Sequence, residues 1–231
     1  MKRDAQVNPM KIEKTELWIS CDEPLGFPDG KALRGFFGNL YRNRPEFHQH
    51  SGDRLIYSHP LIQYKMIENS ALIVGLKEGA YLLKAIPELN HIELHHRNYA
   101  ILEQKLHSST VSCGLTSEPI HYRFATPWIG LNEENHVEYL RIKHKKELVS
   151  KLLRRILVGN ILSMCKSLRY VVESKIEAVL DLEECKKVEI KQGVEMVAFT
   201  GEFKVNFSIP DFWGIGRSSA RGYGTVIRGQ T

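Results

Sequence analysis

The sequence lacks the long apolar segments that mark membrane proteins. No apolar run approaches the roughly 18 residues that a membrane-spanning helix needs. The opening residues Met1-Lys2-Arg3-Asp4-Ala5 are polar and are not followed by the apolar region of a secretory signal. We therefore expect a cytoplasmic protein that has no membrane partner.

Cysteine is scarce and scattered. The four cysteines are too far apart for a CxxC metal site. In a reducing compartment, isolated cysteines are more often buried small side chains than disulfide partners. We therefore assign no chemistry to Cys21, Cys113, Cys165 and Cys185, and we expect neither a bound metal nor another cofactor.

Two common phosphate-binding glycine motifs are also absent. A P-loop requires Lys-Ser/Thr directly after its last glycine, and no such pair follows the glycines near the end of this chain. A dinucleotide fingerprint opens a βαβ unit and has an acidic residue about 20 positions later. Only seven residues follow Gly224, so this motif is excluded as well.

The chain does contain a different glycine-rich segment, Gly214-Ile215-Gly216-Arg217-Ser218-Ser219-Ala220-Arg221-Gly222-Tyr223-Gly224. Paired glycines permit positive φ angles and a close approach of the backbone to a ligand. The arginines and serines between them offer donors that suit phosphate oxygens. A glycine-rich hairpin with exposed arginines fits the same residues, so this segment alone leaves both interpretations open.

Positive charge is concentrated in one stretch of the chain. The net charge is +5, yet residues 141–169 contain nine Lys or Arg against the single acid Glu147. Lys151, Arg154 and Arg155 share one side of a helix expected over residues 147–168. Such concentration is typical of a nucleic-acid partner, although a solvated helix face is the alternative.

Hydrophobic periodicity predicts two similar halves. The first half has a strand at 16–20, a helix at 29–40 that Asp29 can cap, strands at 55–67 and 71–76, a helix at 78–86 and a strand near 92–94. This βαββαβ order is ferredoxin-like. The second half has a strand at 120–129, the helix at 147–168 with Leu148, Leu152, Ile156 and Leu162 inward, strands at 176–182, 187–190 and 196–207, and room only for a short helix within 209–220. We therefore expect an α+β chain of two tandem ferredoxin-like (RRM-like) domains, residues 1–116 and 117–231, the second imperfect.

A histidine pair supplies candidate acid–base groups. His48 and His50 are separated by one residue, and Tyr57 follows seven residues after His50. In an extended segment the two imidazoles project to one side with Cα atoms about 6.5–7 Å apart, so one could accept a proton while the other donates one across a phosphodiester. Tyr57 could orient a histidine or donate a hydrogen bond to a phosphoryl oxygen. A metal site is the rival interpretation, although no third ligand has a spacing that supports it.

Taken together, these segments resemble the CRISPR-associated endoribonucleases that cut precursor guide RNA within each repeat. Gly-Ile-Gly, five residues and Gly-Tyr-Gly match that family's glycine-rich loop. The blocks Arg34-Gly35-Phe36-Phe37-Gly38-Asn39-Leu40, His48-Gln49-His50 and Tyr57-Ser58-His59-Pro60-Leu61-Ile62-Gln63-Tyr64-Lys65 resemble the B-type branch.

The resemblance implies metal-independent cleavage of CRISPR repeat RNA. The RNA's own 2′-hydroxyl attacks the adjacent phosphorus and leaves a 2′,3′-cyclic phosphate and a 5′-hydroxyl. His48 and His50 match the family's histidines and Tyr57 its nearby tyrosine, while the choice of base and acid stays open. Other branches use a lysine to stabilise the transition state, and no motif selects Lys31 or Lys65 for that role. The expected RNA ligands are Gly214, Gly216, Arg217, Ser218, Ser219, Arg221, Gly222, Gly224, Lys151, Arg154 and Arg155.

Two rival functions remain at this stage. One is a repeat-RNA-binding subunit of the same superfamily that no longer cuts, and the other is a metal-dependent hydrolase with His48 and His50 as ligands. Homodimerisation and membership of a CRISPR effector complex are also left open by the sequence.

Overall fold

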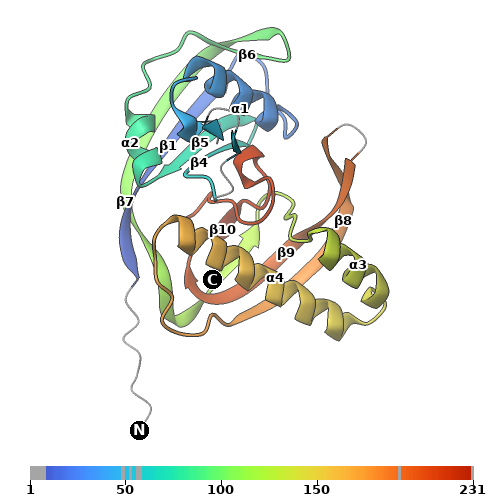
Figure 1. The fold of residues 1–231 in the computed structure, drawn as a ribbon. Helices are drawn as coiled ribbons and strands as arrows, with labels where there is room; N and C mark the ends of the chain where they lie inside the picture. The colour runs from blue at the N-terminus through green and yellow to red at the C-terminus, as the bar shows by residue number, and fades with distance from the viewer. Residues whose placement is uncertain (1–8, 48–49, 52–53, 56–58, 192–193, 230–231) are drawn as a thin grey trace. The chain divides into compact units, whose positions relative to one another are not determined.

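The structure, a computed structural model, describes residues 9–47, 50–51, 54–55, 59–191 and 194–229 (Figure 1). Contacts divide the chain into two compact units. The N-terminal unit comprises Lys11–Val111 and Ser219–Gly222, and the C-terminal unit comprises Ser112–Ser218, the described residues that follow Gly222, and Pro9 and Met10. Among the described helices, none is both long and apolar enough to cross a membrane.

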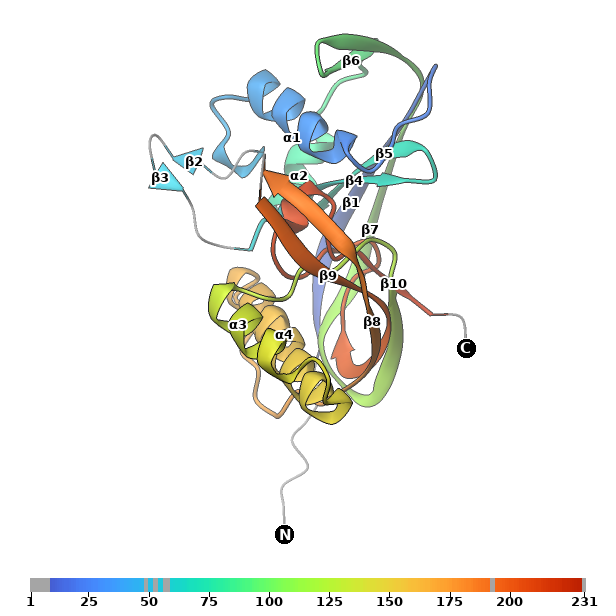
Figure 2. The same ribbon diagram turned by 90° about the vertical axis from the view of Figure 1, so that its right-hand side faces the viewer.

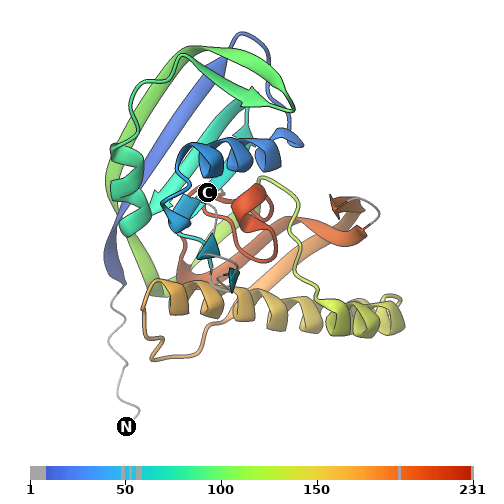
Figure 3. The same ribbon diagram turned by 45° about the horizontal axis from the view of Figure 1, so that its top comes forward.

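The N-terminal unit has the predicted ferredoxin-like order of elements. Its sheet has the strand order β4-β5-β1-β7, in which β5 is antiparallel to both β1 and β4. Figure 3 shows α1 lying across this sheet. The elements are β1 (Met10–Cys21), α1 (Asp29–Leu40), η1 (Pro45–Phe47), β2 (His50–Ser51), β3 (Arg54–Leu55), β4 (Ile62–Ile67), β5 (Ser70–Leu76), α2 (Glu78–Lys84), β6 (His91–Leu94) and the first part of β7 (Arg97–Phe124).

The core of this unit explains why α1 forms where it does. Leu33 and Phe37, four residues apart on one helix face, are completely buried against Leu17, Tyr64 and Ile73 of the sheet. The predicted helix through Leu33, Phe37 and Leu40 is therefore confirmed, and it begins at Asp29.

The predicted capping role of Asp29 is wrong. Pro28 occupies the N-cap position, and it has no side-chain group that could accept a hydrogen bond from the first turn. The Asp29 carboxylate instead accepts a hydrogen bond from the backbone N–H of Gly26 at 2.8 Å, which closes the turn before the helix.

The strand β7 is the main element that the periodicity missed. It runs for 28 residues from Arg97, whereas only residues 120–129 were expected to be extended. Side chains on both faces of its first half are largely exposed, so this part has no apolar alternation to detect. The domain boundary expected between residues 116 and 117 stays a prediction, because β7 continues across it.

The C-terminal unit repeats the ferredoxin-like order of elements, except that no full helix among its described residues corresponds to α2. In its sheet, β9 lies between β8 and the last part of β7, and β10 pairs with the other edge of β7. In the place of the second helix the chain has only the three-residue turn η2. The elements are α3 (Glu133–Ile142), α4 (Lys146–Ser167), β8 (Ala178–Lys191), β9 (Val194–Ser208) and β10 (Val226–Arg228), while η2 (Ser219–Arg221), which lies between β9 and β10 in the sequence, belongs to the N-terminal unit. The predicted α+β class and the imperfect second repeat are confirmed.

Two details of the helical layer differ from expectation. The helix α3, which lies beside α4 in Figure 2, was not predicted. Asn132 caps α3, because its side chain accepts a hydrogen bond from the Asn135 N–H at 2.8 Å. Along α4, Leu152 and Ile156 are buried as expected, whereas Leu148 and Leu162 are exposed. The buried face also includes Leu153, Leu157 and Ile161, so it is rotated around the helix from the face that the sequence suggested.

Positive-φ glycines shape the return of the chain toward β10. Gly224 has φ +62°, and its N–H donates to the Pro127 carbonyl at 2.8 Å. A Cβ atom on Gly224 would lie 2.1 Å from the backbone oxygen of Ile215, a distance that no side chain tolerates. This position therefore requires glycine for both its conformation and its packing.

We expect Gly224→Ala to lower the free energy of unfolding by about 2 kcal/mol or more, because it adds both strain and a backbone clash. Gly159, in α4 of the same unit, has no atom within 4 Å of the Cβ position. Gly159→Ala should be neutral or raise stability by about 0.5–1 kcal/mol. Urea unfolding of both variants tests this, and equal stability of the two would contradict the packing described for Gly224.

Candidate functional site

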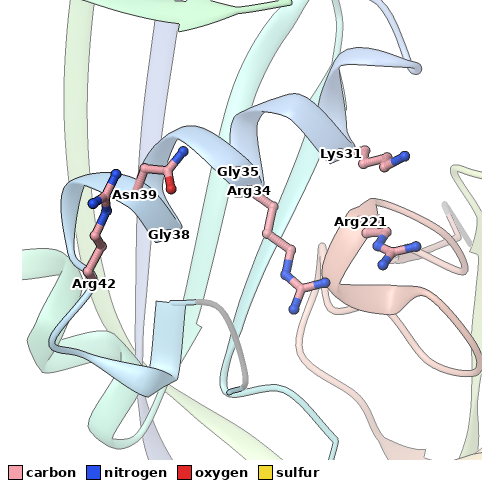
Figure 4. A pocket seen from close by; sticks show the side chains of 7 residues that line it. All are labelled: Lys31, Arg34, Gly35, Gly38, Asn39, Arg42 and Arg221. Atoms are coloured by element: carbon pink, nitrogen blue, oxygen red, sulfur yellow. The ribbon is translucent and has the colours of Figure 1, made fainter. Parts of the chain in front are cut away.

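One face of α1 carries positive charge around two glycines. Lys31, Arg34, Gly35 and Gly38 are spaced so that they share one side of the helix, and Arg42 lies in the turn that follows it. The glycines contribute no side chain, so the surface between the cations is hollowed. These residues, together with Asn39 and Arg221, line a cavity of about 530 Å³ within the N-terminal unit (Figure 4).

The other wall of this cavity is the turn Ser219–Gly222. It packs on α1 and β4 through close backbone contacts rather than through long side chains. A Cβ atom on Gly30 would lie 2.9 Å from the Arg221 carbonyl oxygen, and one on Gly222 would lie 3.3 Å from the Tyr64 oxygen. Gly222 also has φ +96°. These glycines bring Arg221 to the same cavity as Arg34, as Figure 4 shows.

The electrostatics of the cavity favour an anionic ligand. Of the seven described residues that line it, four are cationic and none is acidic. Burial, together with the like charge of Arg221, lowers the pKa of Arg34 from its ordinary value. An arginine keeps its proton despite such a shift, so the repulsion is relieved when an anion binds. Phosphate groups, which guanidinium donors contact in a bidentate manner, suit this arrangement.

The comparisons with known proteins cover both units. A model of the Cas6b N-terminal domain matches residues 10–112, and a model of the Cas6b C-terminal domain matches residues 114–229. A crystal structure of Cas6b is 35% identical over 95% of this chain and 100% of its own, with a TM-score of 0.88. A second structure, of a protein named CRISPR RNA processing endoribonuclease Cas6b, is 33% identical over the same shares, with a TM-score of 0.74.

The chain belongs to the Cas6b family. An uncharacterized protein of Methanocaldococcus jannaschii is also similar, with 49% identity over 117 residues, which are 50% of this chain and 76% of that protein.

Two histidines of this Cas6b chain are predicted to be catalytic, and the structure describes the backbone of only one of them. His50 lies in β2, where it pairs with Leu55 of β3. His48 and Tyr57 lie outside the described residues. Within the described part of the chain, no group of three or more His, Cys, Asp or Glu side chains could hold a metal ion.

The glycine-rich segment divides between the two units. Ser219–Gly222 belongs to the N-terminal unit, and Arg221 lines the cavity, whereas residues 214–218 and 223–224 belong to the C-terminal unit. Arg217 is exposed, and its backbone N–H donates to the Ile129 carbonyl at 2.9 Å. Ser219 is buried. Of the other predicted ligands in this segment, Gly214 forms a β-bridge with Thr225. Gly216, Ser218 and Gly224 have positive φ angles.

The three basic residues predicted on the long helix are all exposed on α4, in the C-terminal unit. The Arg155 guanidinium donates to Glu138 at 2.7 Å and thereby links α4 to α3. Arg154 lines a separate cavity of about 370 Å³ with Lys175 and Lys204. Lys151 completes the set of exposed cations, and all three stay predicted RNA ligands.

Sequence reasoning did not select Arg34, Asn39 or Arg42 as ligands, although the structure places them in the cavity. A signal was present, because the cations and glycines of residues 31–42 repeat at helical spacing on one face. Lys31, which the sequence left unassigned, lines the same cavity. By contrast, Lys65 lies away from solvent inside the strand β4, and its side chain is 0% exposed.

Lys65 also makes the stability of the chain depend on pH. Burial, with a smaller contribution from the charge of Lys14, lowers the pKa of Lys65 to about 7. Between pH 7 and about 10.4 the unfolded chain therefore binds a proton that the folded chain has released. The free energy of unfolding should therefore rise with pH across this range. Below pH 7 Lys65 is charged in both the folded and the unfolded chain, so burial of that charge lowers the free energy of unfolding by its full amount.

We expect the unfolding free energy of the wild type to rise, relative to that of Lys65→Met, by up to about 1.4 kcal/mol per pH unit between pH 7 and 9. Urea unfolding of both proteins at several pH values measures the difference. Other titrating groups, such as Cys21, are common to both proteins and cancel in it. Parallel pH profiles would contradict the low pKa of Lys65.

Proposed function

We propose that this chain is a metal-independent endoribonuclease that cleaves CRISPR repeat RNA to produce mature guide RNAs. The observation that carries the proposal is the cationic cavity between α1 and Arg221, which contains no acidic lining residue among those described. It lies in the same unit as the chain segment that bears His48, His50 and Tyr57. The name of the second Cas6b structure, which describes RNA processing, supports the substrate class.

In the proposed reaction the RNA supplies its own nucleophile. One histidine of the His48–His50 pair removes the proton of the 2′-hydroxyl, whose oxygen then bonds to the adjacent phosphorus. The bond from phosphorus to the 5′-oxygen breaks, and the second histidine donates a proton to that oxygen. The products are a 2′,3′-cyclic phosphate and a 5′-hydroxyl, so protons and atoms balance without a metal ion or added water.

The protein's remaining task is to stabilise negative charge. The phosphorane formed during attack carries more charge on its oxygens than the phosphodiester, and donors fixed in a partly buried site stabilise it more than water does. Arg34, Arg221 and Lys31 supply such donors in the proposed complex, while Tyr57 orients a histidine or a phosphoryl oxygen. Lys151, Arg154 and Arg155 add contacts to the repeat backbone.

We expect the wild type to cleave a cognate repeat RNA in excess EDTA and to leave a 2′,3′-cyclic phosphate. His48→Ala and His50→Ala should each lower the cleavage rate at least about 100-fold, because each removes a proton-transfer group. A 2′-deoxy substitution at the cut should abolish cleavage. Product ends are identified by mass spectrometry.

The matched control for these variants is His107→Ala, an exposed histidine of β7 in the same unit, which should cleave like the wild type. Tight binding without cutting by the wild type would instead indicate a non-cleaving RNA-binding subunit. Loss of cleavage in EDTA that Mg²⁺ or Zn²⁺ restores would indicate a metal-dependent hydrolase.

A second prediction concerns the cavity. With an uncleavable 2′-deoxy repeat RNA, Arg34→Ala and Arg221→Ala should each weaken binding and reduce the dependence of log Kd on log[salt] by about 0.7, because each removes one phosphate contact to a single strand. Lys105→Ala, a cation of β7 paired with Glu103, should change neither quantity. Wild-type affinity and salt dependence in both arginine variants would contradict the assignment of the cavity.

A further inference from the structure

Three polar side chains are buried in β4 and just before it. Lys65 and Gln63 are 0% exposed and His59 is 8% exposed. Their sheet neighbours Leu72 and Val74, which pair with Lys65 and Gln63, are apolar and equally buried. Polar groups in such surroundings are costly unless they are hydrogen-bonded, so their arrangement requires an explanation.

The three side chains form one hydrogen-bonded chain. Lys65 Nζ donates to Gln63 Oε1 at 2.8 Å, and Gln63 Nε2 lies 3.1 Å from His59 Nε2. Among the ion pairs of the described residues, none involves Lys65. Its ammonium group is therefore oriented by an amide rather than by a carboxylate.

The donor properties of these groups determine the protonation of His59. Below pH 7 Lys65 is an ammonium group, which has only donors, so the Gln63 atom that faces it must then be the amide oxygen. The amide nitrogen, which has only donors, then faces His59 Nε2. That ring nitrogen must accept, so the His59 proton resides on Nδ1. The tautomer of the histidine is thus set by a lysine two side chains away.

The same strand also holds the residue before the histidine segment. Tyr64, between Gln63 and Lys65, points to the opposite face of the sheet, and its hydroxyl donates to the Phe47 carbonyl at 3.0 Å. Phe47 is buried and its ring stacks on Tyr41 with 4.6 Å between centroids. Phe47 and His59, which flank the sequence segment that carries His48, His50 and Tyr57, are therefore both hydrogen-bonded to residues of β4.

We propose that β4 positions the reactive segment, with Tyr64 anchoring Phe47 and the Lys65–Gln63 pair anchoring His59 in its Nδ1–H tautomer. Lys65 and Gln63 are positioning residues, since they act through His59 and not on the RNA. The role in cleavage rests on the proposed function, whereas the tautomer of His59 is a property of the protein alone.

Gln63→Glu is the most informative variant, because it changes the shape of the side chain very little. A carboxylate has only acceptors, so it can bond to both Lys65 and a proton on His59 Nε2. We expect nitrogen NMR of the RNA-free protein at pH 6, where Lys65 carries its proton, to show Nδ1–H in the wild type and Nε2–H in Gln63→Glu.

The single-turnover cleavage rate of Gln63→Glu should fall at least tenfold, while its affinity for 2′-deoxy repeat RNA stays within twofold of the wild type. Lys65→Met should lose the single tautomer of His59 and also cleave more slowly. The matched control is Gln104→Glu, an amide of β7 bonded to the Leu89 N–H and the Pro87 carbonyl, which should keep both the tautomer and the rate.

Each result decides a separate point. A wild-type His59 with its proton on Nε2 overturns the hydrogen-bonded chain. A Gln63→Glu protein that has the altered tautomer but the wild-type cleavage rate overturns the positioning role. A wild type that cleaves no repeat RNA, yet has its His59 proton on Nδ1, overturns the proposed function and the positioning role while leaving the chain of hydrogen bonds intact.

Discussion

The close approach of one backbone turn to α1 and β4 is the constraint on which the candidate site depends. Ser219–Gly222 reaches these elements only because Gly30 and Gly222 have no Cβ atoms, which would lie 2.9 Å and 3.3 Å from backbone oxygens. The approach brings Arg221 beside Arg34 without an intervening acid among the lining residues. Two guanidinium groups held together in this way repel each other, and the repulsion is relieved by a bound phosphate. The close packing that these glycines permit thus creates a charge arrangement that favours a phosphate group.

The strand β4 contacts the turn that carries Arg221, and its residues also bond to Phe47 and His59, which flank the predicted histidine segment. Its apolar residues Ile62 and Met66 and the ring of Tyr64 pack in the core of the N-terminal unit, while Gln63 and Lys65 form a buried polar row on the other face. A strand that is buried on both faces is rigid, which suits a role in positioning. In the proposed enzyme, α1 and Arg221 stabilise charge, and β4 holds the two ends of the histidine segment.

The parts of the fold with regular apolar spacing were predictable from the sequence. Leu33 and Phe37 indicated α1, a continuous apolar run indicated β5, and alternation indicated the later part of β9. The hairpin between β6 and β7 was not predictable from its turn, because His95 and His96 both adopt positive φ where Asn-Gly is the usual signal. The exposed first half of β7 and the short helix α3 also lack a strong apolar pattern.

The candidate site was predictable in part for a similar reason. Arg221 was selected because it lies in a recognisable glycine-rich segment, whereas Arg34 and Arg42 resembled ordinary exposed helix cations. What distinguishes them is the turn Ser219–Gly222, which lies nearly 180 residues later in the chain. Lys65 was considered as a stabilising group near the RNA, and only the structure shows that it is buried and bonded to Gln63. Long-range contacts of this kind leave no local pattern.

The most direct test of the account is to locate the RNA on the protein. A 2′-deoxy repeat RNA with 4-thiouridine next to the cut can be photo-crosslinked to the wild type, and the crosslinked peptides identified by mass spectrometry. The account predicts crosslinks within α1 or within residues 214–224. Crosslinks confined to α4, with none in α1 or the glycine-rich segment, would contradict it.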